Sequence, residues 1–205
     1  MIFGILKKQP TATVTDDDVA AVFAAPLNII SNKPAMVADS MSLRRISSST
    51  GVQRWEIEAA IAQTNNNVST FITQLRAGYS NTVYVRMPQP VKVNYFSGTL
   101  KTNGNHSRGA SVITVGSSPT GLQGEFIQFG TLPKVYLVTD TVSSGTSSTI
   151  TIEPPLITAV SHDTSLKIGG NVVMPSFVDP SIALGIKYSD GILLDLGTIK
   201  LVERL

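Results

Sequence analysis

The chain has 205 residues, of which 42% are hydrophobic and only 15% are charged, and its formal net charge is +2. This length allows one sizeable core or two modules, and the low charged share leaves serine, threonine and asparagine to cover much of the surface. A small net charge with basic residues spread along the chain disfavours nucleic-acid binding, and a chain with no cysteine can form neither a disulfide framework nor a thiolate metal site.

The N-terminus carries a short apolar run that is followed by Lys7 and Lys8. A secretion signal has its basic residues before the apolar run, so no such signal is predicted. The apolar runs are also far shorter than the roughly 20 residues that span a bilayer. We therefore expect no membrane insertion.

Three consecutive acidic residues, Asp16 to Asp18, form the first polar cluster. They lack the spaced oxygen ligands and the central glycine of a calcium loop, so a metal site is not predicted. Two interpretations stay open instead: a solvated acidic turn, or the negatively charged start of a short helix through Val19–Phe23. From Ala20 to Met36, prolines exclude a long helix, and irregular structure with short strands is expected.

The next segment predicts a hairpin of strands Ser40–Ile46 and Gln53–Ile61, joined by the turn-forming run Ser47–Gly51. In the second strand Trp55, Ile57 and Ala59 fall on one face and charged residues on the other, as a half-buried strand requires. The period-two pattern therefore identifies Trp55 as the middle of a core-facing strand.

The densest basic feature of the chain consists of Arg44, Arg45 and Arg54. Two interpretations stay open: these arginines face an acidic partner surface or a carboxylate within the fold, or they lie on an ordinary solvated strand face. Trp55, the only tryptophan, is expected to anchor the core against the helix predicted below rather than to stack on a sugar or base.

One helix is predicted over Val68–Leu75, because apolar residues recur there at helical spacing after asparagines that can cap its start. A strand over Thr82–Met87 should follow. Beyond Pro90 the sequence changes to short β-branched and aromatic runs separated by Gly, Ser and Asn, which is typical of a small barrel or sandwich. The runs are Val91–Leu100, Ser111–Val115, Phe126–Phe129, Val135–Thr141 and Thr149–Ile152.

The segment Ile182–Leu205 returns to strand-like alternation, with a hairpin signal at Asp190–Gly191. Its expected role is to pair with the N-terminal sheet, which makes the middle module an insertion. The predicted fold is mainly β with one short helix: an outer β-sandwich or barrel-like domain of residues 1–90 plus 169–205, and an inserted β-barrel of residues 91–168.

No motif carries convincing chemistry. His106 and His162 are expected in solvated loops, and Gly121, Gly124 and the pair Gly169–Gly170 lack the phosphate-loop and dinucleotide signatures, so they are interpreted as turns. No catalytic residue, cofactor or metal is predicted, and the chain is expected not to be an enzyme.

Two segments, Gly124–Thr139 with Thr149–Leu156 after it, contain a strand led by glycine, a Pro-Lys-Val-Tyr strand and a closing strand that ends in Pro and Leu. This order resembles the distal tail proteins of long-tailed bacteriophages, especially the siphophages. Upstream, Leu43–Arg45 and Gly51–Ile57 are similar to a hairpin in the N-terminal domain of that family. The resemblance covers about Met36–Leu205.

The resemblance implies an OB-like inserted barrel and a ring, expected to be a hexamer, that continues the tail tube and joins it to the host-attachment apparatus. The barrels would contact other tail-tip or baseplate proteins or, in some relatives, host-surface sugars. The protein would be made in the host cytoplasm and located in the virion; contractile tails have baseplate or tube-initiating subunits with related outer domains. By the same resemblance, Arg44, Arg45, Arg54 and Trp55 would serve ring or core integrity, and five residues would form barrel structure: Phe126, Phe129, Val135, Tyr136 and Leu156.

Two further functions were weighed for the barrel. A carbohydrate- or receptor-binding module would use Tyr95, Phe96 and Tyr136 as stacking residues. Binding of single-stranded nucleic acid would need a basic groove, for which the segment between Val91 and Leu156 offers only Lys92, Lys101, Arg108 and Lys134. The sparse aromatic residues, 6% of the chain, favour the structural subunit.

Overall fold

The computed structural model describes residues 2–11, 13–39, 45–49, 52–64, 76–77, 80–89, 99–116, 119, 121–181, 187–189, 192–195 and 197–205. This part of the chain is mainly β, as predicted. Its helical residues are two 3-10 turns, η1 (Asp16–Asp18) and η2 (Gly169–Asn171), and residues 76–77. The predicted helix Val68–Leu75 lies outside the described residues.

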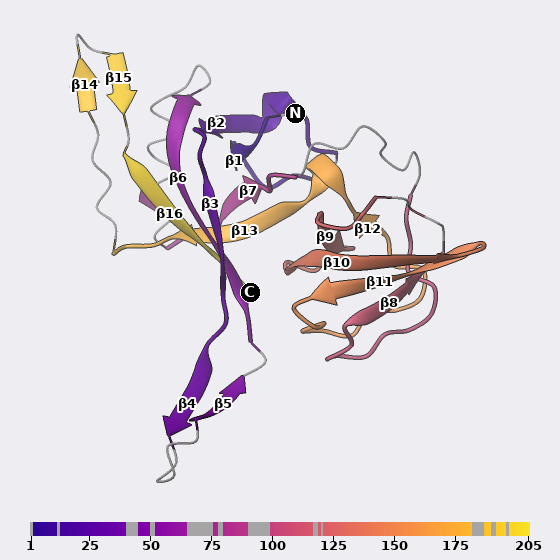
Figure 1. Ribbon diagram of the computed structural model, residues 1–205. Helices are drawn as coiled ribbons and strands as arrows, with labels where there is room; N and C mark the ends of the chain where they lie inside the picture. Colours follow the sequence, from indigo (N-terminus) through magenta and orange to yellow (C-terminus); the bar gives the residue numbers. More distant parts are fainter. Residues whose placement is uncertain are drawn as a thin grey trace.

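The larger sheet in the described part of the chain closes on itself. Its strand order is β16 (Thr198–Glu203), β13 (Val173–Val178), β7 (Val83–Arg86), β1 (Gly4–Leu6), β2 (Val19–Phe23), β6 (Arg54–Thr64) and β3 (Asn28–Asn32). Because β16 also pairs with β6, the sheet forms a barrel, called the outer barrel below, with β3 attached beside it (Figure 1). The C-terminal strand thus joins the N-terminal sheet, as expected.

Strand β6 shows why the sequence folds this way. Trp55, Ile57 and Ala59 are buried inside the outer barrel, which confirms the period-two prediction. They join a core cluster built from strands throughout the outer barrel, and Phe126 and Val135 of the second sheet enter the same cluster. The two sheets therefore pack against each other through shared apolar residues.

Of the two interpretations of the acidic cluster, the short helix through Val19–Phe23 is wrong. The 3-10 turn ends at Asp18, and residues 19–23 form β2 between β1 and β6. Four of the five residues of β2 are buried, so the strand is covered on both faces. Such a strand is a continuous apolar run, which lacks the alternation that would distinguish it from a helix.

The predicted partner of the first hairpin strand is also wrong. β5 (Arg45–Ser49) pairs with β4 (Ala35–Asp39), while the N-terminal half of β6 pairs with β3 and β16. Ser47–Ser49, expected in the turn, lie within β5. Every residue of β4 is exposed, and a ribbon without a buried face imposes no period-two pattern that a sequence could reveal.

The second sheet contains five strands in the order β12 (Leu166–Lys167), β9 (Phe126–Phe129), β10 (Val135–Ser144), β11 (Ser147–Glu153) and β8 (Val112–Val115). The predicted runs match β8 to β11. The edge strands of this sheet are β12 and β8. Residues 101–102 connect these two edges through two β-bridges, Lys101 to Ser165 and Thr102 to Val115, so the sheet closes. Gly121 and Gly124 have φ values of 83° and 82°, as turn glycines do. The OB-like form of this module stays a prediction.

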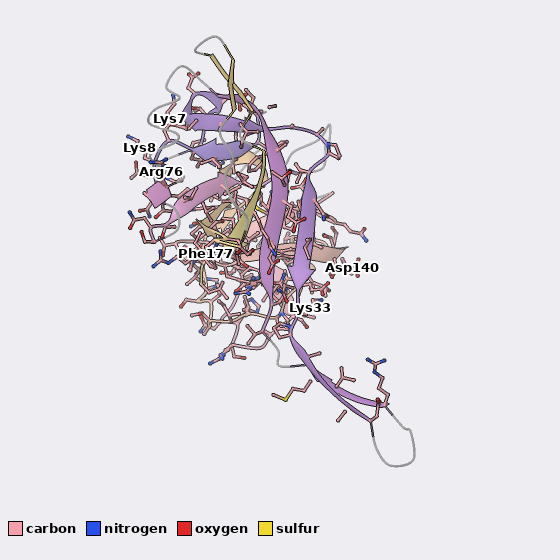
Figure 2. The ribbon with its side chains drawn as sticks, turned by 90° about the vertical axis from the view of Figure 1, so that its left-hand side faces the viewer. Lys7, Lys8, Lys33, Arg76, Asp140 and Phe177 are labelled. Atoms are coloured by element: carbon pink, nitrogen blue, oxygen red, sulfur yellow. The ribbon has the colours of Figure 1, made fainter. Side chains whose placement is uncertain are left out.

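Two hairpins project from the outer barrel (Figure 1). One consists of β14 (Lys187–Ser189) and β15 (Ile192–Asp195), whose pairing confirms the predicted hairpin around Asp190–Gly191. The other consists of β4 and β5 and is called the arm below. Figure 2 shows the arm extending away from the body of the molecule, past Lys33 at its base.

Candidate assembly surface

The arm continues β3 and β6 as a long two-stranded ribbon. Pairing runs from Asn28–Glu58 to Asn32–Arg54 and resumes from Ala35–Ser49 to Asp39–Arg45. Met36 is 74% exposed and Val37 is 49% exposed, although both are large hydrophobic residues. An isolated two-stranded hairpin is marginally stable at best in water. The arm is therefore a part of the described chain that needs a contact beyond its own core.

A charged network holds the root of the arm to the outer barrel. The Glu56 carboxylate on β6 accepts a hydrogen bond from Asn32 Nδ2 at 2.7 Å and lies 3.0 Å from Lys200 Nζ and 3.6 Å from Arg54 Nε. Lys200 also lies 3.6 Å from Asp179. The network joins β3, β6 and β16, the three strands that meet where the ribbon leaves the barrel.

This network predicts an acid-sensitive contribution to stability. Burial acts to raise the pKa of Glu56, but the hydrogen bond from Asn32 and the contact with Lys200 outweigh it and hold the pKa below its ordinary value of 4.5. A carboxylate whose pKa is lowered by folding stabilises the protein above its unfolded pKa, and that stabilisation is lost as the pH falls through the folded pKa. Glu56→Gln should lower Tm by a few degrees at pH 7, and the difference from wild type should shrink as the pH falls below 4.5 through the lowered pKa of Glu56.

Thermal unfolding followed by circular dichroism between pH 7 and pH 3 measures this difference. Glu58→Gln is the comparison: Glu58 lies on the same side of β6 and faces Lys200 across the pair with β16, but among the described residues it has no cation within ion-pair distance, so its loss should lower Tm less. A Tm difference for Glu56→Gln that stays constant over the whole pH range would contradict the prediction.

A buried polar cluster, called the joint below, fixes the second sheet to the outer barrel. Lys134 Nζ donates to the carbonyl oxygen of Gln53 at 3.0 Å, to Gln53 Oε1 at 2.8 Å and to the Glu203 carboxylate. Glu203 also accepts the backbone N–H groups of Trp55 and Val135, at 3.0 and 2.9 Å. The side chains of Lys134 and Glu203 are both 0% exposed. Burial lowers the pKa of Lys134, and the Glu203 carboxylate opposes that shift.

Trp55 completes the joint. Its indole N–H donates to the Val135 carbonyl at 2.9 Å, and its ring meets Phe126 edge-on with centroids 5.2 Å apart. The tryptophan is 5% exposed, so its predicted place in the core is confirmed; it packs on the second sheet, and the helix predicted as its partner lies outside the described residues. The joint lies at the base of the arm, because Gln53 and Trp55 lie where the ribbon enters the outer barrel. On the facing strand of the ribbon, Lys33 follows β3 and forms an ion pair with Glu153 of the second sheet.

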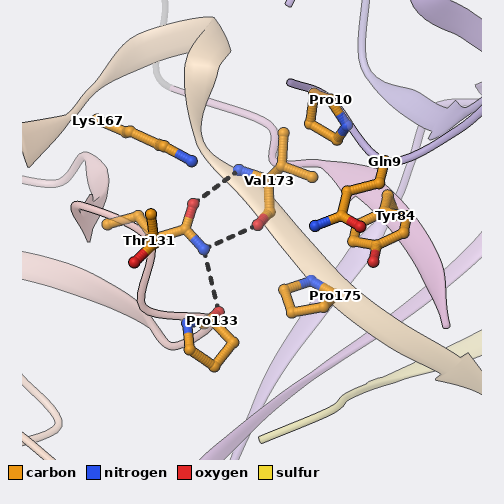
Figure 3. Close-up of a pocket in the computed structure, with 9 residues that line it drawn as sticks. Gln9, Pro10, Tyr84, Thr131, Pro133, Lys167, Val173 and Pro175 are labelled. Atoms are coloured by element: carbon orange, nitrogen blue, oxygen red, sulfur yellow. Dashed lines mark hydrogen bonds between the residues drawn. The ribbon is translucent and has the colours of Figure 1, made fainter. Parts of the chain in front are cut away.

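Two buried glutamines form a second connection between the sheets. Gln89 accepts the Phe126 N–H at 2.8 Å and donates to the Phe126 carbonyl at 3.1 Å, as a neighbouring strand would. Gln128 donates to the carbonyls of Pro133 and Val173, at 3.1 and 3.0 Å (Figure 3). The two sheets are thus joined by specific hydrogen bonds as well as by apolar packing.

Gln128 also borders a small open pocket between the two sheets, which Figure 3 shows in close-up. Its volume is about 150 Å³, below the roughly 300 to 1,000 Å³ of common ligand pockets. The residues around it are Gln9, Pro10, Tyr84, Gln128, Thr131, Pro133, Lys167, Val173 and Pro175.

The four predicted site residues do not form one cluster. Arg45 and Arg54 pair with Asp39 and Asn32 of the facing strand, seven positions apart, which corresponds to roughly 23 Å along the ribbon. Arg54 faces the Glu56 carboxylate of its own fold, Arg45 lies exposed on the arm, and Trp55 belongs to the joint. Arg44 lies outside the described residues.

The acidic cluster serves the fold. Arg86, 4% exposed, lies 2.6 Å from Asp16 and donates to the carbonyls of Ile2, Val14 and Gly170. The backbone N–H of Ile2 and the Arg86 guanidinium hold the pKa of Asp16 below its ordinary value. Asp16 thereby fixes the N-terminal segment onto β7. Of the described residues, no three His, Asp or Glu side chains gather into a group that could hold a metal ion.

The barrel residues proposed for ligand stacking are corrected by their burial. Tyr136 is 0% exposed; its ring packs edge-on to Phe129, and its hydroxyl accepts the Ile157 N–H. It cannot stack on a sugar or base. Lys134, counted toward a basic groove, is buried in the joint, and Lys101 pairs with Asp163 at 2.9 Å. Tyr95, Phe96 and Lys92 lie outside the described residues.

Sequence reasoning missed the joint and both glutamines. Lys134 and Glu203 are 69 positions apart, and each alone resembles a solvated charge. The one usable signal was the place of Lys134 directly before the apolar run Val135–Val138, where a strand is buried. A lysine at the start of such a run indicates a buried partner.

Within the described chain, no helix has both the length and the apolar character needed to cross a membrane. No protein-family model matches the sequence, and no curated protein matches it.

Proposed function

We propose that this chain is a structural subunit of a bacteriophage tail tip or baseplate, in which copies form a ring that joins the tail tube to the host-attachment apparatus. The observation that carries the proposal is the arm, a ribbon exposed on every residue of β4 and with large hydrophobic side chains in water. An arm of this kind is stabilised by a neighbouring subunit. The class of assembly comes from the ordered motifs that resemble distal tail proteins.

The anchorage of the arm supports an assembly role. The Glu56 network and the joint fix the root of the ribbon to both sheets, so the arm starts from a rigid base. A pre-organised element loses less conformational entropy on binding than a mobile loop does. The second sheet, held by the same joint, would keep a fixed orientation relative to the ring.

The arm predicts a specific effect on self-association. Met36 and Val37 lie on opposite sides of β4, so replacing both by serine removes the exposed apolar side chain from whichever side a subunit contact buries, which should weaken association at least about tenfold. The fold should be unaffected, since exposed substitutions change stability by about 0.5 kcal/mol or less. Sedimentation velocity over a concentration series measures the change.

Leu205→Ser is the matched control, because Leu205 is also a large exposed hydrophobic residue, at 53%, but follows β16 and is not part of the arm. This variant should associate as the wild type does. If the arm variant and the control associate equally well, the arm does not form the subunit contact. A wild-type chain that stays monomeric at every concentration and is absent from virions would refute the proposed function.

Receptor or carbohydrate binding by the barrel is a second prediction, compatible with a tail-tip location. The burial of Tyr136 gives it no support, so the structural role is the one we propose.

A further inference from the structure

Exposed large hydrophobic residues fall into two groups in the described part of the chain. Met36 and Val37 lie on the arm, with Val52 at its root, while Val112 (52% exposed) and Val142 (58%) lie on the second sheet. Leu205 is the other such residue. Exposed apolar groups of this kind mark contact sites when they share a surface.

Val112 and Val142 share one surface of the second sheet, called the second-sheet face below. Cross-strand pairing places Val112, Thr151 and Asp140 in one row and Thr114, Thr149 and Val142 in the next. The alternate residues Ile113 and Ile150 are 0% exposed and point into the core, so the six side chains point outward. The two valines lie on β8 and β10, which flank β11 at a total separation of about 10 Å.

The arm carries a matching surface on one side. Val37 and Asp39 share one face of β4, and the pairing of Asp39 with Arg45 puts the Arg45 side chain on that face too. Met36 points to the opposite side. This face of the arm therefore presents an apolar side chain and, near the end of the ribbon, an exposed guanidinium beside the Asp39 carboxylate.

Each surface carries one exposed charge that can pair with a charge on the other, Arg45 on the arm and Asp140 on the second sheet. Asp140 is exposed and accepts only the backbone N–H of Thr141, and no cation of the described chain pairs with it. Arg45 likewise has no ion pair among the described residues, Asp39 included. An ion pair between Arg45 and Asp140 would place Val37 over the neighbouring valines of the second-sheet face.

We propose that the arm of one copy packs on the second-sheet face of a neighbouring copy, with Val37 against Val112 and Val142 and with Arg45 beside Asp140. The proposal rests on the proposed function and specifies its subunit contact. Both halves of the contact belong to this chain, which favours a second copy as the partner. Because the halves are different surfaces, the contact is head-to-tail and passes from copy to copy, closing into a ring where the rotation permits.

Thiol crosslinking tests the contact, since the chain has no cysteine of its own. Val37→Cys is mixed with a size-tagged Val142→Cys under ring-forming conditions and treated with a bifunctional thiol reagent that spans about 10 Å, the spacing of packed sheets. On a denaturing gel, the mixture should give a band at the combined size of one tagged and one untagged chain. Two controls should give at least about fivefold less of it: Met36→Cys, on the opposite side of β4, and Lys101→Cys in place of Val142→Cys.

The outcomes separate the contact from the proposed function. If the wild type forms rings but Val37→Cys links to Val142→Cys no better than the controls do, the contact is wrong and the ring subunit stands. If a chain that carries both cysteines links only within itself, the arm covers its own barrel and the contact is also wrong. If the wild type forms no rings, both proposals fail. Unchanged circular dichroism spectra confirm that each variant is folded.

Discussion

Replacing Lys134 with methionine should destabilise the protein by about 3–5 kcal/mol, since the Glu203 carboxylate would remain buried without its counter-ion. Both side chains are 0% exposed, so water cannot take the place of the ammonium group. Urea unfolding, followed by the emission of Trp55 in the joint, measures the loss. Lys101→Met is the control: its ion pair with Asp163 is exposed, and removing it should cost about 0.5 kcal/mol or less.

A second substitution shows whether the buried charge causes the loss. Combining Lys134→Met with Glu203→Gln removes the uncompensated charge while keeping an acceptor for the Val135 N–H. The double variant should be more stable than Lys134→Met alone by at least about 1 kcal/mol. If Lys134→Met costs no more than Lys101→Met does, the joint does not hold the two sheets together.

Trp55→Ala should be comparably severe, at about 3–5 kcal/mol, because it removes a buried ring that packs on Phe126 of the second sheet and leaves the Val135 carbonyl without its indole donor. Trp55→Phe keeps an aromatic ring near Phe126 and loses the hydrogen bond, so it should cost about 1–3 kcal/mol. Circular dichroism during urea unfolding measures both losses.

The neighbouring residue provides the control for Trp55. Arg54→Ala changes a side chain that is 48% exposed and lies 3.6 Å from Glu56, and it should cost about 0.5 kcal/mol or less. Equal losses for Arg54→Ala and Trp55→Ala would contradict the assignment of Trp55 to the joint.

The fold was predictable from the sequence where burial on one face imposes a period. Trp55, Ile57 and Ala59 alternate with charged residues, and β6 lies where this alternation predicts a strand. Turn glycines and β-branched runs located β8 to β11 in the same way. These signals are local, because each depends on residues two to four positions apart.

Features without a local signal were not predictable. β4 is exposed along its whole length, so no alternation of buried and exposed residues reveals it, and the serine run within β5 has the composition of a turn. β2 is buried on both faces and resembled a short helix. The joint depends on Glu203 reaching Lys134 across 69 positions, and only the assembled fold brings these two residues together.

The candidate site shows the same division. The sequence singled out Arg45, Arg54 and Trp55, which now lie at the arm, the root network and the joint. It did not indicate that β4 is exposed along its whole length, nor that Val112 and Val142 share an outer face. Exposure of this kind is a property of the tertiary arrangement.

Electron microscopy of the purified chain, with particles sorted by rotational symmetry, tests the central claim most directly. The account predicts ring particles of one symmetry, six-fold if the resemblance to distal tail proteins holds, and predicts that Met36→Ser/Val37→Ser greatly reduces their number while Leu205→Ser does not. Single compact particles at every concentration, or rings that form equally well without the apolar residues of the arm, would contradict it.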